Sequence, residues 1–174
     1  MTMKRSLSGV LAAAAGLALT ATACAQGNPR GTSKVTLGKK TVSVDFGRPS
    51  LNGRKVEDLL SQLGAGDVWR LGADSSTTFV TSGELSFGDV KIPAGTYSLW
   101  ARKDADNSWK LVFNKQHGQW GTQHDAAKDL GAVPLTESKA DSPAEQVTID
   151  LAKADNGGSI AILWGDMKLS ANFQ

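Results

Sequence analysis

The chain of 174 residues contains only one cysteine, Cys24. A disulfide within the chain is therefore impossible, and the folded state has to be stabilised by the burial of apolar side chains. About 150 residues follow Cys24, enough for one domain that buries about 68–70 % of its unfolded surface. The sequence predicts a single domain with its own hydrophobic core.

The sequence also lacks an excess of charge of either sign. It contains 19 Lys and Arg against 17 Asp and Glu, a net charge of +2. Lys4 and Arg5 account for that difference, so the rest of the chain is formally neutral. Nucleic-acid-binding domains usually carry a pronounced basic patch. We therefore do not expect nucleic acid as a partner.

No apolar run is long enough for a transmembrane helix, which needs about 20 residues. The longest run, 7–21, follows two basic residues and precedes Ala23-Cys24-Ala25. This order is typical of a secretory signal peptide. We expect residues 1–25 to be the signal peptide and the protein to be periplasmic or extracellular. The alternative is a membrane anchor through lipidation of Cys24, although Ala21 stands where a large aliphatic residue would be more usual.

Motifs of common catalytic sites are missing. The chain has no G-x-S-x-G elbow, no glycine-rich phosphate loop and no cysteine beyond Cys24. Its only histidines, His117 and His124, are seven residues apart with Asp125 directly after the second, but they lack the HExxH spacing and the ligand number of a zinc site. We assign no catalytic residue, metal or cofactor, and we favour a binding protein over an enzyme.

The stretch from Val68 to Asn114 does show a clear pattern, because apolar residues alternate in short runs between turn residues. Pro93 and Gly95 suit a tight hairpin turn, with Gly95 in a left-handed conformation. In the run that follows, Tyr97 and Leu99 share one face and are expected in the core. The pattern predicts an antiparallel meander.

The flanking segments extend this pattern. Residues 26–33 are polar and are expected to form a flexible tether, after which 34–47 reads as one strand. An apolar stripe over 56–63 predicts one helix of about three turns that ends at Gly64. We expect this helix to cap one end of the sheets.

The C-terminal part contains three further strands at 147–151, 159–164 and 167–173, the last two separated by a turn at Gly165-Asp166. Residues 125–145 read as a weakly structured connection with one short strand near 132–135. Together the segments predict an all-β domain over 34–174, an antiparallel β-sandwich or jelly-roll-like fold with one short helix.

Four blocks of the sequence are specific enough to compare with a known family: 46–50 (FGRPS), 68–74 (VWRLGAD), 92–99 (IPAGTYSL) and 113–121 (FNK followed by GQWG). In order and spacing they resemble domain-of-unknown-function family 2911, a family of exported bacterial proteins. The resemblance covers 42–173, with Asp74 in place of an expected Asn. It implies one exported β-rich domain and no assigned activity.

Within these blocks, polar and aromatic side chains on predicted loops are the candidates for ligand binding: Arg48, Trp69, Arg70, Asp74, Asn114, Lys115, Gln119 and Trp120. The leading interpretation is binding of a small molecule, a glycan or an envelope partner. One alternative is a hydrolase-like enzyme in which the Arg, Asn and Lys side chains clamp an anion. Another is a purely structural protein, with the arginines bonded to turn carbonyls and Trp120 plugging the sandwich.

Tryptophan is common among the few aromatic residues. Trp69, Trp109 and Trp164 are in phase with apolar neighbours and are expected in the core. Trp100 shares its face with Ser98 and is expected to be exposed, where it could stack on a sugar ring.

Overall fold

The computed structural model describes residues 27–174. The expected signal peptide at 1–25, including Cys24, lies outside the described residues. Within the part of the chain that the structure describes, no helix has the length and apolarity needed to cross a membrane.

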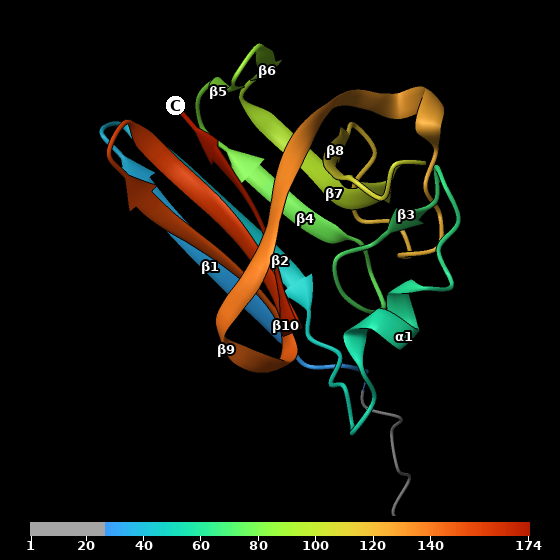
Figure 1. Cartoon of the computed structure of the whole chain (residues 1–174). Helices are drawn as coiled ribbons and strands as arrows, with labels where there is room; N and C mark the ends of the chain where they lie inside the picture. Colours follow the sequence, from blue (N-terminus) through green and yellow to red (C-terminus); the bar gives the residue numbers. More distant parts are fainter. Residues whose placement is uncertain (1–26) are drawn as a thin grey trace, which may run out of the picture.

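The fold class predicted from the sequence is confirmed: the domain is an antiparallel, nearly closed β-sandwich with one short α-helix (Figure 1). Its elements in chain order are β1 (Arg30–Leu37), β2 (Lys40–Gly47), α1 (Val56–Leu60), β3 (Val68–Trp69), β4 (Thr77–Thr81), β5 (Leu85–Phe87), β6 (Val90–Ile92), β7 (Gly95–Lys103), β8 (Trp109–Asn114), a 3₁₀ turn (Ala126–Lys128), β9 (Asp129–Ala154) and β10 (Gly157–Phe173).

The main sheet follows the order β1-β2-β4-β7-β8-β9-β10, and β3 pairs with β7. In Figure 1 the long ribbon of β9 runs from the β8 side of the molecule to the β1 side. There the backbone N–H of Leu151 donates to Ser33 Oγ at 2.9 Å. β9 therefore pairs with β8 at its start and contacts β1 near its end, which nearly closes the sandwich.

The core fills the space between these strands. Phe113 is fully buried and packs against Phe79 and Phe87, with ring centroids 5.3 and 5.2 Å away. Tyr97 and Leu99 are buried, as the strand pattern predicts. The Tyr97 hydroxyl donates to the Pro93 carbonyl at 2.9 Å, and burial raises the pKa of this phenol.

The N-terminal strand prediction is incomplete. Val42, Val44 and Phe46 are buried on one face of β2 as expected. However, 34–47 forms a hairpin and not a single strand, with Gly38 at φ 60° in its turn. β1 begins at Arg30, so half of the expected tether is strand.

Three other local predictions are wrong. The helix α1 has five residues and ends before Gly64, although buried Val56 and Leu60 do dock it on the sheet. Gly95 is not left-handed, and the hairpin turn lies one strand earlier, at Gly88 with φ 59° between β5 and β6. Gly165 makes a bulge inside the continuous strand β10, not a turn between two strands.

The predicted weak connection over 125–145 is also wrong, because β9 is a continuous strand from Asp129 to Ala154. Its middle portion is mostly exposed, with Ala140 buried among polar neighbours. Pairing with β10 on either side, through 136–139 and 144, and not an apolar pattern of its own, holds this portion in the strand.

Candidate functional site

Three of the sequence blocks meet at one end of the sandwich. A Cβ atom on Gly47 would overlap the backbone of Ala73, so these two segments can touch only because residue 47 is glycine. Gly121 N donates to the Asp74 carbonyl at 2.8 Å, and Ser76 N donates to the Gln119 carbonyl at 2.9 Å. The segments 47–49, 70–76 and 119–121 are therefore packed as one unit.

The 70–76 segment has an unusual backbone. Leu71 and Asp74 have φ values of 54° and 61°, and Leu71 is fully buried. A bulky non-glycine residue in the left-handed region is strained, and such strain persists only where the surroundings hold it. The Asp74 carboxylate accepts from Asn28 N at 2.8 Å, which ties down the start of the described chain.

This unit borders a cleft of about 260 Å³. Trp69 borders the cleft, but its ring lies on the core side of the sheet, where it stacks on Trp164 with ring centroids 5.5 Å apart and planes 13° from parallel. The cleft is lined by Leu63, Val68, Trp69, Arg70, Trp100, Gly121, Thr122 and His124.

Arg70 supplies the positive charge of the cleft. A Cβ on Gly121 would overlap its Cδ, so the side chain of Arg70 passes the loop at a glycine. No hydrogen bond or ion pair joins its side chain to any of residues 27–174. Guanidinium donors match carboxylate and phosphate oxygens in geometry. Arg70 is thus free to bind an anion.

Trp100 lies beneath the same cleft, and the prediction that it is exposed is wrong: its exposed fraction is 1 %. The loop that follows β8 folds back over the second face of β7 and makes a small second core there. Ser98 Oγ accepts from Trp100 Nε1 at 2.8 Å and from Gln119 Nε2 at 3.2 Å, and donates to the Gln116 carbonyl at 2.7 Å. Gln119 is thus a member of this network.

Asn114, at the end of β8, anchors the same loop through hydrogen bonds. It is fully buried, and its Nδ2 donates to the Asp125 carbonyl at 2.8 Å and to Asp129 Oδ1 at 2.6 Å. Its Oδ1 accepts from Gln116 N at 2.9 Å. The amide is fully used inside the protein, so Asn114 positions other groups and does not face a ligand.

His124 is the cleft residue that the sequence did not mark for this role. Its Nε2 lies 2.9 Å from Asp129 Oδ1, and its ring lies against Trp100 with centroids 4.9 Å apart. The sequence offered His124 only as a weak metal ligand. No signal in the sequence pairs it with Asp129.

The remaining predicted site residues lie outside the cleft. Arg48 donates to the Val147 carbonyl and to Thr148 Oγ1, at 3.2 and 3.3 Å, and so holds β9 against β2. Lys115 and Trp120 are exposed on the loop. Arg48, Arg70, Asn114 and Lys115 do not come together into one clamp.

Trp120 has an exposed fraction of 51 % and therefore contributes little burial. We expect Trp120→Ala to lower the free energy of unfolding by less than about 1 kcal/mol. Trp100→Ala, a matched change in the second core, should cost about 3–5 kcal/mol. Urea denaturation of both variants measures this difference. A loss at Trp120 as large as that at Trp100 would make it a structural plug.

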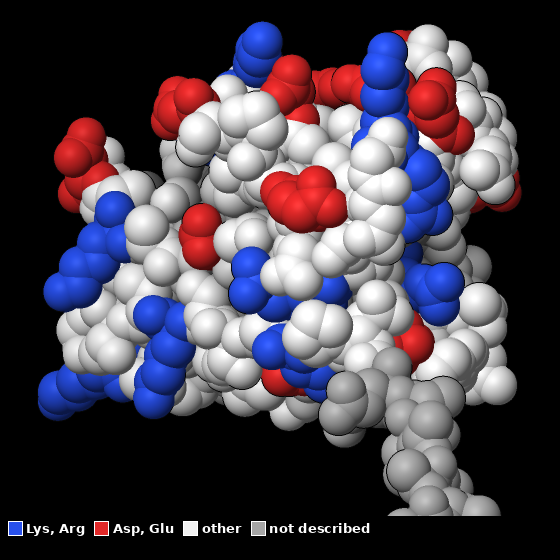
Figure 2. Space-filling model, turned by 90° about the horizontal axis from the view of Figure 1, so that it is seen from below, with Lys and Arg blue, Asp and Glu red and all other residues white. Residues whose placement is uncertain are grey.

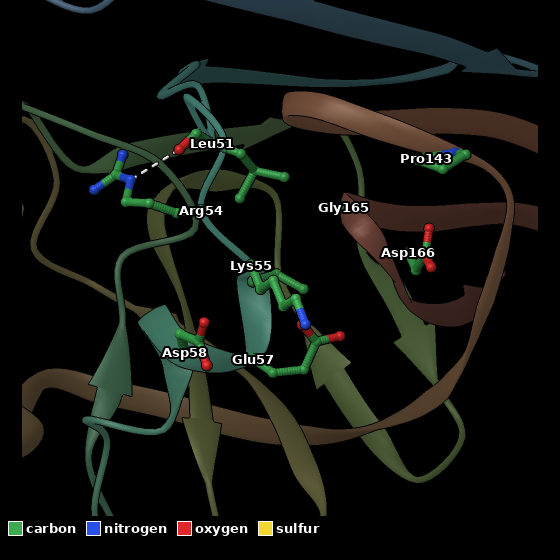
Figure 3. Close-up of a pocket in the computed structure, with 9 residues that line it drawn as sticks. Leu51, Arg54, Lys55, Glu57, Asp58, Pro143, Gly165 and Asp166 are labelled. Atoms are coloured by element: carbon green, nitrogen blue, oxygen red, sulfur yellow. Dashed lines mark hydrogen bonds between the residues drawn. The ribbon is translucent and has the colours of Figure 1, made fainter.

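A larger hollow, of about 570 Å³, lies between α1 and the Gly165 bulge (Figure 3). Arg54 donates there to the Leu51 carbonyl at 2.8 Å, and Lys55 points toward Glu57. Its positive groups are therefore directed at acceptors of the protein itself. This hollow provides fewer unpaired groups for a ligand than the Arg70 cleft does. Among the described residues no group of three or more His, Cys, Asp or Glu could hold a metal.

Fold and site together define an antiparallel β-sandwich with a small cleft at its end that is lined by aromatic residues and Arg70. The model of the family described as protein of unknown function DUF2911 matches residues 28–173. The chain therefore belongs to domain-of-unknown-function family 2911, as the four sequence blocks predict. No curated protein matches it. No solved structure matches it either.

Proposed function

We propose that this protein is an exported, non-enzymatic domain that binds a small anionic molecule in the cleft between Trp69, Arg70 and His124. The observation that carries the proposal is the Arg70 guanidinium, which has no hydrogen-bond or ion-pair partner among the described residues and lines the cleft together with Trp100 and His124. Export rests on the N-terminal sequence pattern.

The size of the cleft supports a small ligand. Its volume of about 260 Å³ is just below the usual range of ligand pockets, roughly 300–1,000 Å³. A polymeric glycan or a protein partner would have to contact surfaces beyond it. The apolar lining residues Leu63, Val68 and Trp100 favour an apolar body, and Arg70 favours a carboxylate or phosphate group.

Charge at longer range is not arranged to attract a polyanion. Seen from below, the molecule carries both Lys or Arg and Asp or Glu side chains on the same face (Figure 2). Arg70 is the one Lys or Arg among the described residues that line the cleft, so a single acidic group is the expected complement.

The proposal is tested with small anions as probes: inorganic phosphate, benzoate and phenylacetate. We expect at least one aromatic carboxylate to raise the unfolding temperature of the wild type, because a ligand that binds the folded state stabilises it. Arg70→Gln should weaken that binding by roughly 10- to 100-fold, since charge-assisted hydrogen bonds contribute about 1.5–3 kcal/mol. Titration by nuclear magnetic resonance gives the dissociation constants.

Lys115→Gln is the matched control, because it removes one positive charge from an exposed loop position outside the cleft. It should leave the dissociation constants unchanged. Equal weakening in both variants would mean non-specific attraction, and no effect of Arg70→Gln would remove the cleft from consideration.

A further inference from the structure

His124 adds a second polar group to the cleft, and its contacts determine what that group can do. The Asp129 carboxylate accepts hydrogen bonds, and its Oδ1 already receives one from Asn114. The proton of a neutral imidazole is therefore held on Nε2, toward Asp129, and Nδ1 is left as a hydrogen-bond acceptor.

The Nδ1 atom is also accessible. No hydrogen bond joins it to any of the described residues. Within residues 27–174 the one enclosed side-chain nitrogen or oxygen without a partner is Trp164 Nε1. His124 Nδ1 is thus not completely enclosed by protein, and His124 is one of the residues that line the cleft.

The cleft therefore offers two different polar contacts on its lining. Arg70 donates hydrogen bonds and carries positive charge, whereas neutral His124 accepts a hydrogen bond. A matching ligand has an acidic group and, close to it, a hydrogen-bond donor. A hydroxyl meets this need better than an ammonium group, because an ammonium would lie near the positive Arg70 guanidinium.

We propose that the ligand of this cleft is a small hydroxy acid, with its acidic group on Arg70 and its hydroxyl donating to His124 Nδ1. This inference rests on the proposed function and specifies its ligand class. Asp129 and Asn114 are positioning residues, since they orient the imidazole without lining the cleft.

Three probes of nearly the same shape test the inference: phenylacetate, mandelate and phenylglycine, which carry hydrogen, hydroxyl and ammonium at the same carbon. We expect mandelate to bind the wild type roughly 3- to 10-fold more tightly than phenylacetate, the effect of one added hydrogen bond. Phenylglycine should bind more weakly than mandelate.

Two variants locate the effect. His124→Phe keeps an aromatic ring against Trp100 but has no acceptor, so mandelate and phenylacetate should bind it equally well. Thr122→Val is the matched control, because Thr122 also lines the cleft with a hydroxyl. It should keep the preference for mandelate. Loss of the preference in Thr122→Val and not in His124→Phe would overturn the assignment.

A measurement on the wild type covers the case in which His124→Phe does not fold. The ¹⁵N resonance of His124 Nδ1 should shift on addition of mandelate but not of phenylacetate; His117→Asn assigns the two imidazoles. An unshifted resonance with mandelate bound overturns the inference. Equal binding of both acids through Arg70 also overturns it and leaves the proposed function standing. If none of the anions binds, both proposals fail.

Discussion

Gly47→Ala is expected to destabilise the protein by about 3 kcal/mol or more, because the added methyl group has no free space. A Cβ at this position would overlap the backbone oxygen of Ala73, and backbone cannot rotate away as a flexible side chain can. The segment 70–74 would have to move, although buried Leu71 already holds it in a strained conformation. Urea denaturation measures the loss.

Gly38→Ala separates this overlap from the ordinary effect of replacing a glycine. Gly38 has φ 60° in the β1–β2 turn, and no atom lies within 4 Å of the place that an added methyl group would take. Its replacement should cost only about 1–2 kcal/mol through backbone strain. If Gly47→Ala is no worse than Gly38→Ala, the contact between 47–49 and 70–74 is not tight.

Much of the fold could be predicted from the sequence, because the inner strands follow the alternation rule. β2 buries Val42, Val44 and Phe46 on one face, as their spacing predicts. The rule fails for β7, where Ser98 and Trp100 are buried on the second face as well. The loop that follows β8 covers that face, and the sequence of β7 by itself contains no pattern that predicts this contact.

Turns were less predictable than strands for a similar reason. The Pro93–Gly95 motif has suitable turn residues, yet the hairpin forms around Gly88 because β6 pairs with β5. Likewise, the polar middle of β9 is held in the strand by pairing with β10 on both sides of an unpaired stretch at 140–143. These choices depend on long-range partners, which a single sequence does not display.

The candidate site was predictable in part. Trp69 and Arg70 were chosen as polar and aromatic residues of one block, and both line the cleft. Arg48 and Asn114 were chosen on the same grounds, but their hydrogen-bonding groups bind the protein itself. Residue type alone does not show whether the hydrogen-bonding groups of a side chain already have partners within the protein. That difference depends on the tertiary contacts.

Asn114→Asp should also cost about 3 kcal/mol or more, although the two side chains have nearly the same shape. The Asn114 amide nitrogen donates to the Asp125 carbonyl and to Asp129 Oδ1 in a fully buried position. A carboxylate there would face two acceptors and a second negative charge, and an unpaired buried charge is strongly destabilising. Asn107→Asp, the same change in the exposed β7–β8 turn, should alter stability by less than about 0.5 kcal/mol.

Denaturation of both variants gives the comparison, and the imidazole ¹⁵N spectrum of Asn114→Asp should show His124 released from its fixed orientation. Stability equal to wild type would mean that the Asn114–Asp129–His124 chain does not hold the loop over the cleft.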